Sequence, residues 1–257
     1  MFGWNSFDLK IGNIEKKIHK SARAGKKMHF ALIDPDMRKL STEQISQRCK
    51  KLGEWGTDAV LVGGSTHFRR NDVDATIEAI RSACSIPIVL YPSKPGALSE
   101  KADGILFMSL LNSRDPWWIS EAQTKAAAWV KNSGLEVMPM AYLIVSPGMT
   151  VGRVGKAKLI KHKEISRAVG YAIAAQLFGF RIVYLEAGSG ASKPVPVEMV
   201  RAVKNSLDVP LIVGGGIRDA QTARERLEAG ADIIVTGTAI ENDIQKHEAV
   251  VRAIKGF

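Results

Sequence analysis

Residues 210–238 read PLIVGGGIRDAQTARERLEAGADIIVTGT. The segment contains two short apolar runs, each followed by glycine, and between them a polar segment whose apolar residues recur with helical spacing. Short, near-continuous apolar runs are typical of strands buried on both faces, as in a parallel sheet covered by helices. The segment therefore predicts a strand, a helix that begins near Asp219 and a second strand parallel to the first.

The same unit recurs along the 257 residues of the chain. Apolar runs predict strands at 28–33, 59–62, 86–91, 104–111, 137–145, 181–187, 210–214 and 232–236. Amphipathic segments predict helices at 41–55, 71–83, 115–131, 165–178, 197–206, 219–229 and 241–254, with an extra helix near 13–24. This alternation indicates an α/β fold, a TIM (β/α)₈ barrel, as a single domain over residues 1–257 in which 1–25 form an N-terminal helical extension.

The third crossover departs from this pattern. Only eleven residues, 92–102, lie between Tyr91 at the end of the third predicted strand and Asp103 just before the fourth, and they include Pro92, Pro95 and Gly96. This segment is too short for a helix with a turn at each end. We therefore expect a modified barrel in which a short irregular segment replaces the third helix. The resulting gap would expose apolar faces that either bind a greasy ligand or are covered by another subunit.

Composition limits the class of protein. Hydrophobic residues make up 46% and charged residues 24%, which excludes wholesale disorder. The net charge of +10 favours anionic partners such as phosphate esters, nucleic acid or an acidic membrane face. The two cysteines are too few for a disulfide framework and indicate a reducing compartment. Without a signal-like or membrane-spanning apolar run, we expect a soluble, cytoplasmic protein.

Glycines follow the last two predicted strands, at the barrel end where active sites form. Gly214, Gly215 and Gly216 follow the seventh strand, and Gly237 and Thr238 follow the eighth. Glycine lets backbone N–H groups approach an anion, and the helix that follows adds its positive dipole end. Glycine-rich turns can also merely save space, but two in neighbouring units predict a phosphate site.

Carboxylates and hydroxyls follow the first two strands. Asp34 and Asp36 could hold Mg²⁺, or they could form a turn that caps a helix. Ser65 and Thr66 could add a hydroxyl ligand or a phosphate contact. The five histidines show no metal-binding spacing, so zinc is not expected.

Glu186 is the strongest catalytic candidate because it ends the sixth strand beside the predicted phosphate site. Its carboxylate could accept a hydroxyl proton or orient a polyol, although it could also simply bond neighbouring amides. Tyr184 lies on the same side of the strand, because side chains alternate with a period of two.

The sequence resembles the geranylgeranylglyceryl phosphate synthase family, which forms the first ether bond of archaeal membrane lipids. The resemblance runs over essentially the whole chain and is most specific at Tyr-Leu-Glu-Ala-Gly-Ser-Gly-Ala, residues 184–191. Further matches are Ile33-Asp34-Pro35-Asp36, Gly63-Gly64-Ser65, Val213-Gly214-Gly215-Gly216-Ile217-Arg218 and Gly237-Thr238. The family fold also lacks the third helix of the barrel.

The resemblance implies a Mg²⁺-dependent prenyltransferase that joins sn-glycerol 1-phosphate to geranylgeranyl diphosphate and releases diphosphate. It implies metal ligation by Asp34 and Ser65, catalytic roles for Glu186 and Tyr184, and a prenyl tail along the gap in the helix ring. Relatives of this kind imply a homo-oligomer, either a dimer or a hexamer. The glycerol phosphate positions that it implies are Tyr184, Leu185, Glu186, Ala187, Gly188, Ser189, Gly190, Gly215, Gly216, Gly237 and Thr238.

Several alternatives stay open at this stage. The donor could be longer, as in heptaprenylglyceryl phosphate synthases, or the chain could be another phosphate-binding barrel enzyme, although no acid and base pair ends strands one and five. No nucleic-acid motif accompanies the dispersed positive charge, so we expect no nucleic-acid partner. The basic segment 150–167 either is solvated or steers a diphosphate or transient contact with an anionic membrane. Trp117 and Trp118 either pack in the core or close the far end of the tail groove.

Overall fold

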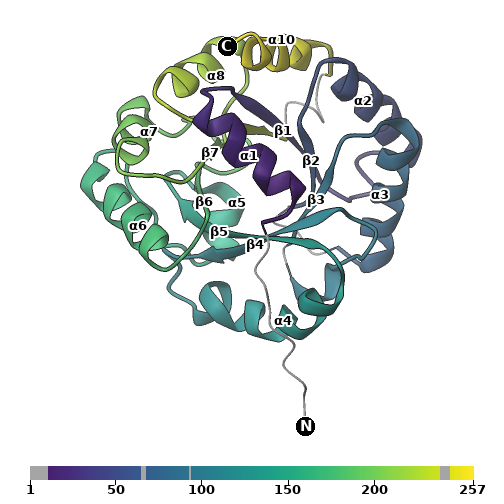
Figure 1. Cartoon of the computed structure of the whole chain (residues 1–257), viewed down its shortest axis with the longest axis horizontal. Helices are drawn as coiled ribbons and strands as arrows, with labels where there is room; N and C mark the ends of the chain where they lie inside the picture. Colours follow the sequence, from purple (N-terminus) through teal and green to yellow (C-terminus); the bar gives the residue numbers. More distant parts are fainter. Residues whose placement is uncertain (1–10, 65–67, 93, 238–243) are drawn as a thin grey trace.

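The computed structural model describes residues 11–64, 68–92, 94–237 and 244–257. Eight parallel strands form a closed barrel in chain order, and helices surround it (Figure 1). The TIM-barrel prediction is confirmed, and the predicted strands agree with the observed ones to within about two residues. The strands are β1 (Met28–Ile33), β2 (Ala59–Gly63), β3 (Ile88–Tyr91), β4 (Gly104–Leu110), β5 (Glu136–Ile144), β6 (Ile182–Glu186), β7 (Leu211–Gly214) and β8 (Ile233–Thr236).

Burial on both faces of the strands explains why their sequences are almost continuously apolar. In β1, Phe30 points into the barrel, whereas Ala31 and Ile33 belong to the layer beneath the helices. The barrel closes where β8 pairs with β1, with Met28 opposite Ile233. Neighbouring parallel strands carry their C-terminal ends to one rim, so the glycine-rich turns and Glu186 lie at the same end.

The helices also follow the predicted pattern. Ser41 caps α2 (Thr42–Glu54) through a capping box, and the Asp219 carboxylate accepts the Thr222 N–H at the start of α8 (Ala220–Glu228). A short helix, α5 (Met149–Val154), was not predicted. The predicted helix 115–131 is present as a π-helical turn (Trp117–Glu121) followed directly by α4 (Ala122–Asn132). In chain order, the longer helices are α1 (Asn13–Arg23), α2 (Thr42–Glu54), α3 (Arg70–Ala83), α4 (Ala122–Asn132), α6 (Ile165–Leu177), α7 (Val197–Lys204), α8 (Ala220–Glu228) and α10 (Ile244–Lys255). No helix of the described part is long and apolar enough to cross a bilayer.

The third crossover is short, as expected. Between β3 and β4 the described chain forms one 3₁₀ turn, η1 (Pro95–Ala97). Proline at the start of this turn and the small number of residues account for the missing helix. The ring of helices is therefore open between α3 and α4.

Helix α1 crosses the barrel end opposite to the glycine-rich rim (Figure 1). The N–H groups of Ile14 and Glu15 donate to the Glu136 carboxylate at the start of β5, at 3.0 and 2.7 Å. Glu15 is itself buried and accepts two hydrogen bonds from Arg181, at 2.6 and 2.9 Å. Ile18 is buried in the inner barrel cluster. This helix therefore closes the lower end of the barrel.

Replacing Glu15 with glutamine is expected to lower the free energy of unfolding by about 2 kcal/mol. This is less than the roughly 3–5 kcal/mol of a fully buried pair, because the Arg181 side chain is 21% exposed. Burial alone would raise the pKa of Glu15, but hydrogen bonds from His19 and Arg181 outweigh burial and the pKa is lowered from 4.5. The contribution is therefore present at neutral pH and is lost as pH falls below about 4.5 toward the folded-state pKa.

Urea denaturation at pH 7 measures the effect. A double variant that also carries Arg181→Met is expected to lose less stability than the sum of the two single variants, because the pair is removed together. Full additivity would show that the Glu15–Arg181 contact contributes no coupling energy.

Candidate active site at the C-terminal rim

Glu186 and Tyr184 both point from β6 into the barrel, and both are buried, at 6% and 1% exposed. Two further tyrosines, Tyr91 of β3 and Tyr142 of β5, lie against them. The ring centroids of Tyr142 and Tyr184 are 5.1 Å apart, and Tyr91 lies 5.8 Å from Tyr142 and 6.2 Å from Tyr184. One carboxyl group therefore sits in a cluster of three phenol rings at the top of the barrel.

The electrostatics of this cluster favour a protonatable carboxyl group. Burial raises the pKa of Glu186, and hydrogen bonds from Tyr184, the Gly188 N–H and Tyr142 only partly offset it. The Gly188 N–H donates to Glu186 Oε1 at 2.6 Å, which fixes the orientation of the carboxylate. A buried carboxylate with a raised pKa is a competent general base. The sequence analysis also allowed Glu186 simply to bond a neighbouring amide, and the Gly188 N–H makes that hydrogen bond.

Glycine at the end of β7 is required by the approach of β6. An added Cβ at Gly214 would lie 2.2 Å from the Tyr184 hydroxyl, and one at Gly215 would lie 2.3 Å from Glu186 Oε1. Gly215 also has a φ of +81°, a conformation that side chains disfavour. The structure thus brings the predicted glycine turn directly against both predicted catalytic side chains.

The turns after β6 and β7 are held together by a residue to which sequence reasoning assigned no role. The Arg218 guanidinium donates to the carbonyl oxygens of Gly190 and Ala191, at 2.7 and 3.1 Å. Gly188 and Gly190 both have positive φ, at +99° and +73°, a backbone conformation that residues with side chains rarely adopt. These contacts pre-form the turn before any ligand binds.

A buried polar network holds the end of β8. Thr236 lies between His29 Nε2 and His247 Nε2, at 2.8 and 3.0 Å from its Oγ1. Burial lowers the pKa of His29 well below its usual value and lowers that of His247 to about 4, so both rings are neutral at pH 7. The network fixes the strand one residue before Gly237. Thr238 lies outside the described residues.

Replacing Gly215 with alanine is expected to lower the free energy of unfolding by about 1–3 kcal/mol and to displace the Glu186 carboxylate. The reason is that the new methyl group would also lie 2.6 Å from the Gly188 backbone nitrogen, which cannot move without opening the turn. Gly190→Ala is the matched control, because Gly190 has a similar φ of +73° but no atom within 4 Å of its added Cβ. Denaturation curves of the two variants measure the difference. If both variants lost the same amount of unfolding free energy, the loss would come from the positive φ alone, and the predicted clash with Gly188 would be contradicted.

Asp34 and Asp36, at the end of β1, have different environments. Asp36 accepts two hydrogen bonds from the Arg38 side chain, both at 2.8 Å, and these lower its pKa to about 2. Asp34 is paired with Lys39 at 2.8 Å, and its Oδ1 approaches Gly64 so closely that an added Cβ there would lie 2.2 Å away. Ser65 and Thr66 fall outside the described residues. Of the two carboxylates, Asp34 is the one that faces the end of β2.

The chemistry of Asp34 fits Mg²⁺. The described residues contain no group of three His, Cys, Asp or Glu side chains that would form a complete protein cage. Mg²⁺ does not require one, because it is commonly held by one or two carboxylates together with water and substrate phosphate oxygens. The Asp34 side chain is 21% exposed at the rim, so solvent and a phosphate ligand can reach it.

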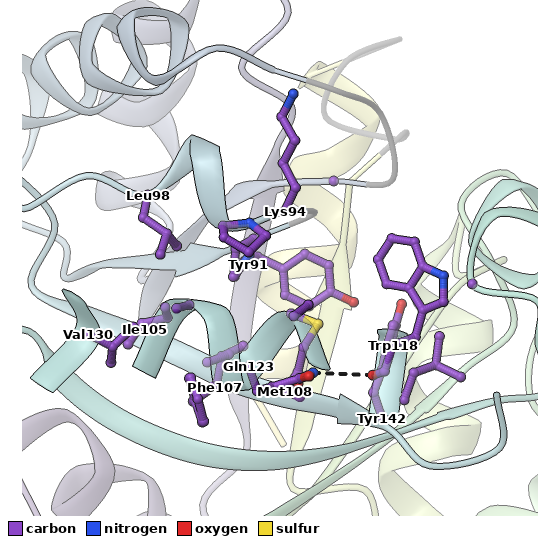
Figure 2. A pocket seen from close by; sticks show the side chains of 18 of the residues that line it. Tyr91, Lys94, Leu98, Ile105, Phe107, Met108, Trp118, Gln123, Val130 and Tyr142 are labelled. Carbon is purple, nitrogen blue, oxygen red and sulfur yellow. Dashed lines mark hydrogen bonds between the residues drawn. The ribbon is translucent and has the colours of Figure 1, made fainter. Parts of the chain in front are cut away.

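An apolar groove opens beside the cluster, where the third helix is missing. Tyr91 and Tyr142 line both the groove and the Glu186 cluster, so the two sites share a wall (Figure 2). Trp118 lines the groove as well, whereas Trp117 stacks against Lys125, whose Nζ is 5.6 Å from the ring centre. The remaining lining comes from η1, β4, α4 and α5 and is almost entirely apolar, including Leu98, Ile105, Phe107, Met108, Leu110, Ala126 and Val130.

Tyr91 and Tyr142 are functional candidates that the sequence reasoning missed. Each lies in a predicted strand, and period-two alternation would have placed each on the barrel-facing side. What the pattern does not contain is their convergence on Glu186, which depends on barrel closure. The basic segment, by contrast, is partly paired: Lys156 bonds Asp115 at 2.7 Å, Arg167 bonds Glu164 at 3.0 Å, and His162 Nε2 lies 2.7 Å from the Ser146 carbonyl oxygen.

Comparison with known proteins shows the family of the chain. The PcrB family matches residues 21–256. The chain is 50% identical to geranylgeranylglyceryl phosphate synthase of Pyrococcus abyssi, over 94% of this chain and 95% of that protein, and 48% identical to that of Thermococcus kodakarensis, over 96% and 100%. The crystal structure of (S)-3-O-geranylgeranylglyceryl phosphate synthase from Thermoplasma acidophilum, in complex with its substrate sn-glycerol-1-phosphate, superposes with a TM-score of 0.91 at 40% identity, covering 96% of this chain and 100% of that one. This chain therefore belongs to the PcrB family.

Proposed function

We propose that this protein transfers the geranylgeranyl group of geranylgeranyl diphosphate to sn-glycerol 1-phosphate and releases diphosphate. The single observation that carries the proposal is the position of the buried Glu186 carboxylate, between the glycine turn of β7 and the wall of the apolar groove. A phosphate ester with a free hydroxyl fits the first side, and a prenyl chain fits the second. The similarity to geranylgeranylglyceryl phosphate synthases supports this pair of substrates.

The glycine turns bind the glycerol phosphate in this proposal. Gly188, Gly190, Gly215 and Gly216 all have positive φ and lie in the turns that Arg218 joins. Backbone N–H groups in such turns suit a phosphate, and the N-terminus of α8 adds a positive dipole end. Leu185, Ala187 and Ser189 belong to the same stretch as Gly188 and Gly190. Gly237 directly follows β8, the strand next to β7, and Thr238, which the resemblance also implies, lies outside the described residues.

Glu186 then acts as the general base. The glycerol hydroxyl oxygen forms the new bond to the first carbon of the prenyl chain, and the bond from that carbon to the diphosphate oxygen breaks with its electron pair. The hydroxyl proton passes to Glu186. Tyr184 orients the carboxylate and the hydroxyl, and exclusion of water by the three tyrosine rings limits hydrolysis of the donor.

The groove holds the prenyl tail. Transfer of each CH₂ group from water to an apolar wall contributes about 0.8 kcal/mol, so a long tail supplies much of the binding free energy. Asp34, with Ser65, would hold Mg²⁺ against the diphosphate, and the bound ion would supply neutralisation of the leaving group.

One assay tests the proposal and its alternative. Purified protein is incubated with sn-glycerol 1-phosphate or with its mirror-image 3-phosphate, and with prenyl diphosphates of C₂₀ and C₃₅ length. We expect ether product from the 1-phosphate and the C₂₀ donor. Preference for C₃₅ would instead favour a heptaprenylglyceryl phosphate synthase, and no ether product with any pair would contradict the prenyltransferase. The cytoplasmic location and the homo-oligomer, a dimer or a hexamer, stay predictions; light scattering measures the latter.

A further inference from the structure

The outer face of α1 carries an unusual density of positive charge. Lys16, Lys17, Lys20 and Arg23 are exposed along this helix, and Lys26 follows in the next turn of chain. Lys17 pairs with Asp58 at 3.3 Å, and the other cations have no carboxylate partner among the described residues. The inner face, with Ile14, Glu15 and Ile18, closes the barrel, so the cations face away from it.

Asp58 pairs with Lys17, but the other carboxylates around α1 do not neutralise this face, because they bond inward. Glu15 bonds Arg181, and Glu136 accepts the first N–H groups of the helix. Asp232 accepts the Leu211 N–H and pairs with Lys204. The exposed acids at this barrel end include Glu54, Asp208 and Glu228, at the ends of the outer helices or in the loops after them. Glu100 and Asp103 are also exposed, in the segment that leads into β4, where Asp103 pairs with Arg81. None of these acids is on α1.

Large apolar side chains are exposed at the same end. Leu177 is 81% exposed and Phe178 is 74% exposed, at the C-terminal end of α6. The loop that they begin leads to Arg181, which bonds Glu15 of α1. Because loops that lead into parallel strands share one barrel end, the loop that begins with Leu177 and Phe178 lies at the same end of the barrel as α1.

We propose that this end of the barrel, defined by the α1 cations and by Leu177 and Phe178, docks on an anionic lipid bilayer. Cations and exposed apolar side chains at one end of a protein suit the headgroup region, where charge is attracted to anionic lipids and apolar groups enter the acyl boundary. Nucleic acid offers nothing for Leu177 and Phe178. A second copy that docked face to face would set like charges against each other.

The groove is oriented to suit this docking, a link that rests on the proposed function. Figure 2 shows Ile105 and Val130 at one end of the groove and Trp118 at the other. Ile105 is near the start of β4 and Leu110 ends it, so the lining spans about 16 Å along the strand. A tail whose diphosphate lies at the rim would extend toward the barrel end that faces the bilayer.

Vesicle co-sedimentation without either substrate tests the docking. The protein is mixed with vesicles of equal phosphatidylglycerol and phosphatidylcholine, or of phosphatidylcholine alone. We expect binding to the anionic vesicles only, weakened by salt. Lys16→Gln, Lys20→Gln and Arg23→Gln together are expected to weaken it about 100-fold, at roughly fivefold per charge. Leu177→Ser with Phe178→Ser is expected to weaken it at least tenfold.

The matched control removes the same charge from the other end of the barrel. Lys158, Lys161 and Lys163 are exposed in the basic segment near the rim, and their replacement by glutamine is expected to leave vesicle binding within about twofold. Thermal unfolding verifies that each variant is folded. Binding lost in this control but kept in the α1 variant would overturn the proposal, as would tighter binding to duplex DNA that ignores Leu177 and Phe178. Because no substrate is present, the outcome is independent of prenyl transfer.

Discussion

Replacing Glu186 with glutamine is expected to lower kcat for prenyl transfer by about 10²–10⁴-fold, the usual contribution of a general base. Glutamine keeps the shape of the side chain and can still accept the Gly188 N–H, but it cannot take the hydroxyl proton. The KM of each substrate is expected to change only a few-fold, because the interaction is needed in the transition state. Steady-state kinetics with each substrate varied in turn measures both.

The stability of this variant distinguishes a functional carboxylate from a structural one. Burial raises the pKa of Glu186, so the folded state favours its protonated form, and above that pKa the buried charge costs stability. Glu186→Gln is therefore expected to be as stable as the parent protein at pH 7, or more stable. Tight structural pairing predicts the reverse, a clear loss on substitution.

The pH dependence has the same origin. Since the base must be ionised, activity is expected to fall as pH decreases, starting at a higher pH than for an ordinary glutamate. Glu198, exposed in the first turn of α7, supplies the matched control: Glu198→Gln removes one negative charge from an exposed position rather than from the buried cluster, and it is expected to leave kcat unchanged. Full activity of Glu186→Gln would remove the assigned role.

Removal of Mg²⁺ by chelation is expected to lower activity by about 10³-fold, which corresponds to several kcal/mol of charge stabilisation on the leaving diphosphate. Added Mg²⁺ is expected to restore it. Asp34→Asn is expected to raise the Mg²⁺ concentration that gives half-maximal activity at least tenfold, because the amide loses the charge that attracts the ion. A Mg²⁺ titration of each variant measures this shift.

Asp36 provides the comparison for Asp34. The same Asp36→Asn change removes a carboxylate that Arg38 already occupies with two hydrogen bonds, so the Mg²⁺ requirement is expected to stay within about twofold. If Asp36→Asn shifted the titration and Asp34→Asn did not, the metal ligand would be assigned to the wrong carboxylate. Activity that survives chelation unchanged would contradict a Mg²⁺ requirement altogether.

The fold could be predicted closely because strands buried on both faces leave a plain record in the sequence. The run before Gly214 and the run before Gly237 correspond to β7 and β8 with small shifts at their ends. The missing third helix followed from Pro92, Pro95 and the short connection. Helix α5 was not predicted, because it is a single short element without an amphipathic repeat and begins after Gly148, a glycine in the left-handed conformation.

The candidate site could also be predicted in part, namely where its residues depend on local sequence. Glu186 and Tyr184 were identified because a polar residue at the end of an apolar strand, and its neighbour two residues earlier, must lie at the rim on one side of the strand. The sequence alone also separated the glycine turns as phosphate-binding candidates. These features are local, since each depends on a strand and on the few residues that follow it.

Only the tertiary structure decided which groups converge. Tyr91 and Tyr142 reach Glu186 because barrel closure brings β3, β5 and β6 to one interior, and their sequence separation conceals this. The different environments of Asp34 and Asp36 likewise depend on tertiary contacts, because Arg38 bonds the Asp36 carboxylate whereas Asp34 faces the end of β2. The groove exists because α4 and η1 do not fill the space beside β4. Local sequence patterns indicate which strands are buried. Contacts between distant strands depend on how the whole barrel packs, and no short stretch of sequence indicates them.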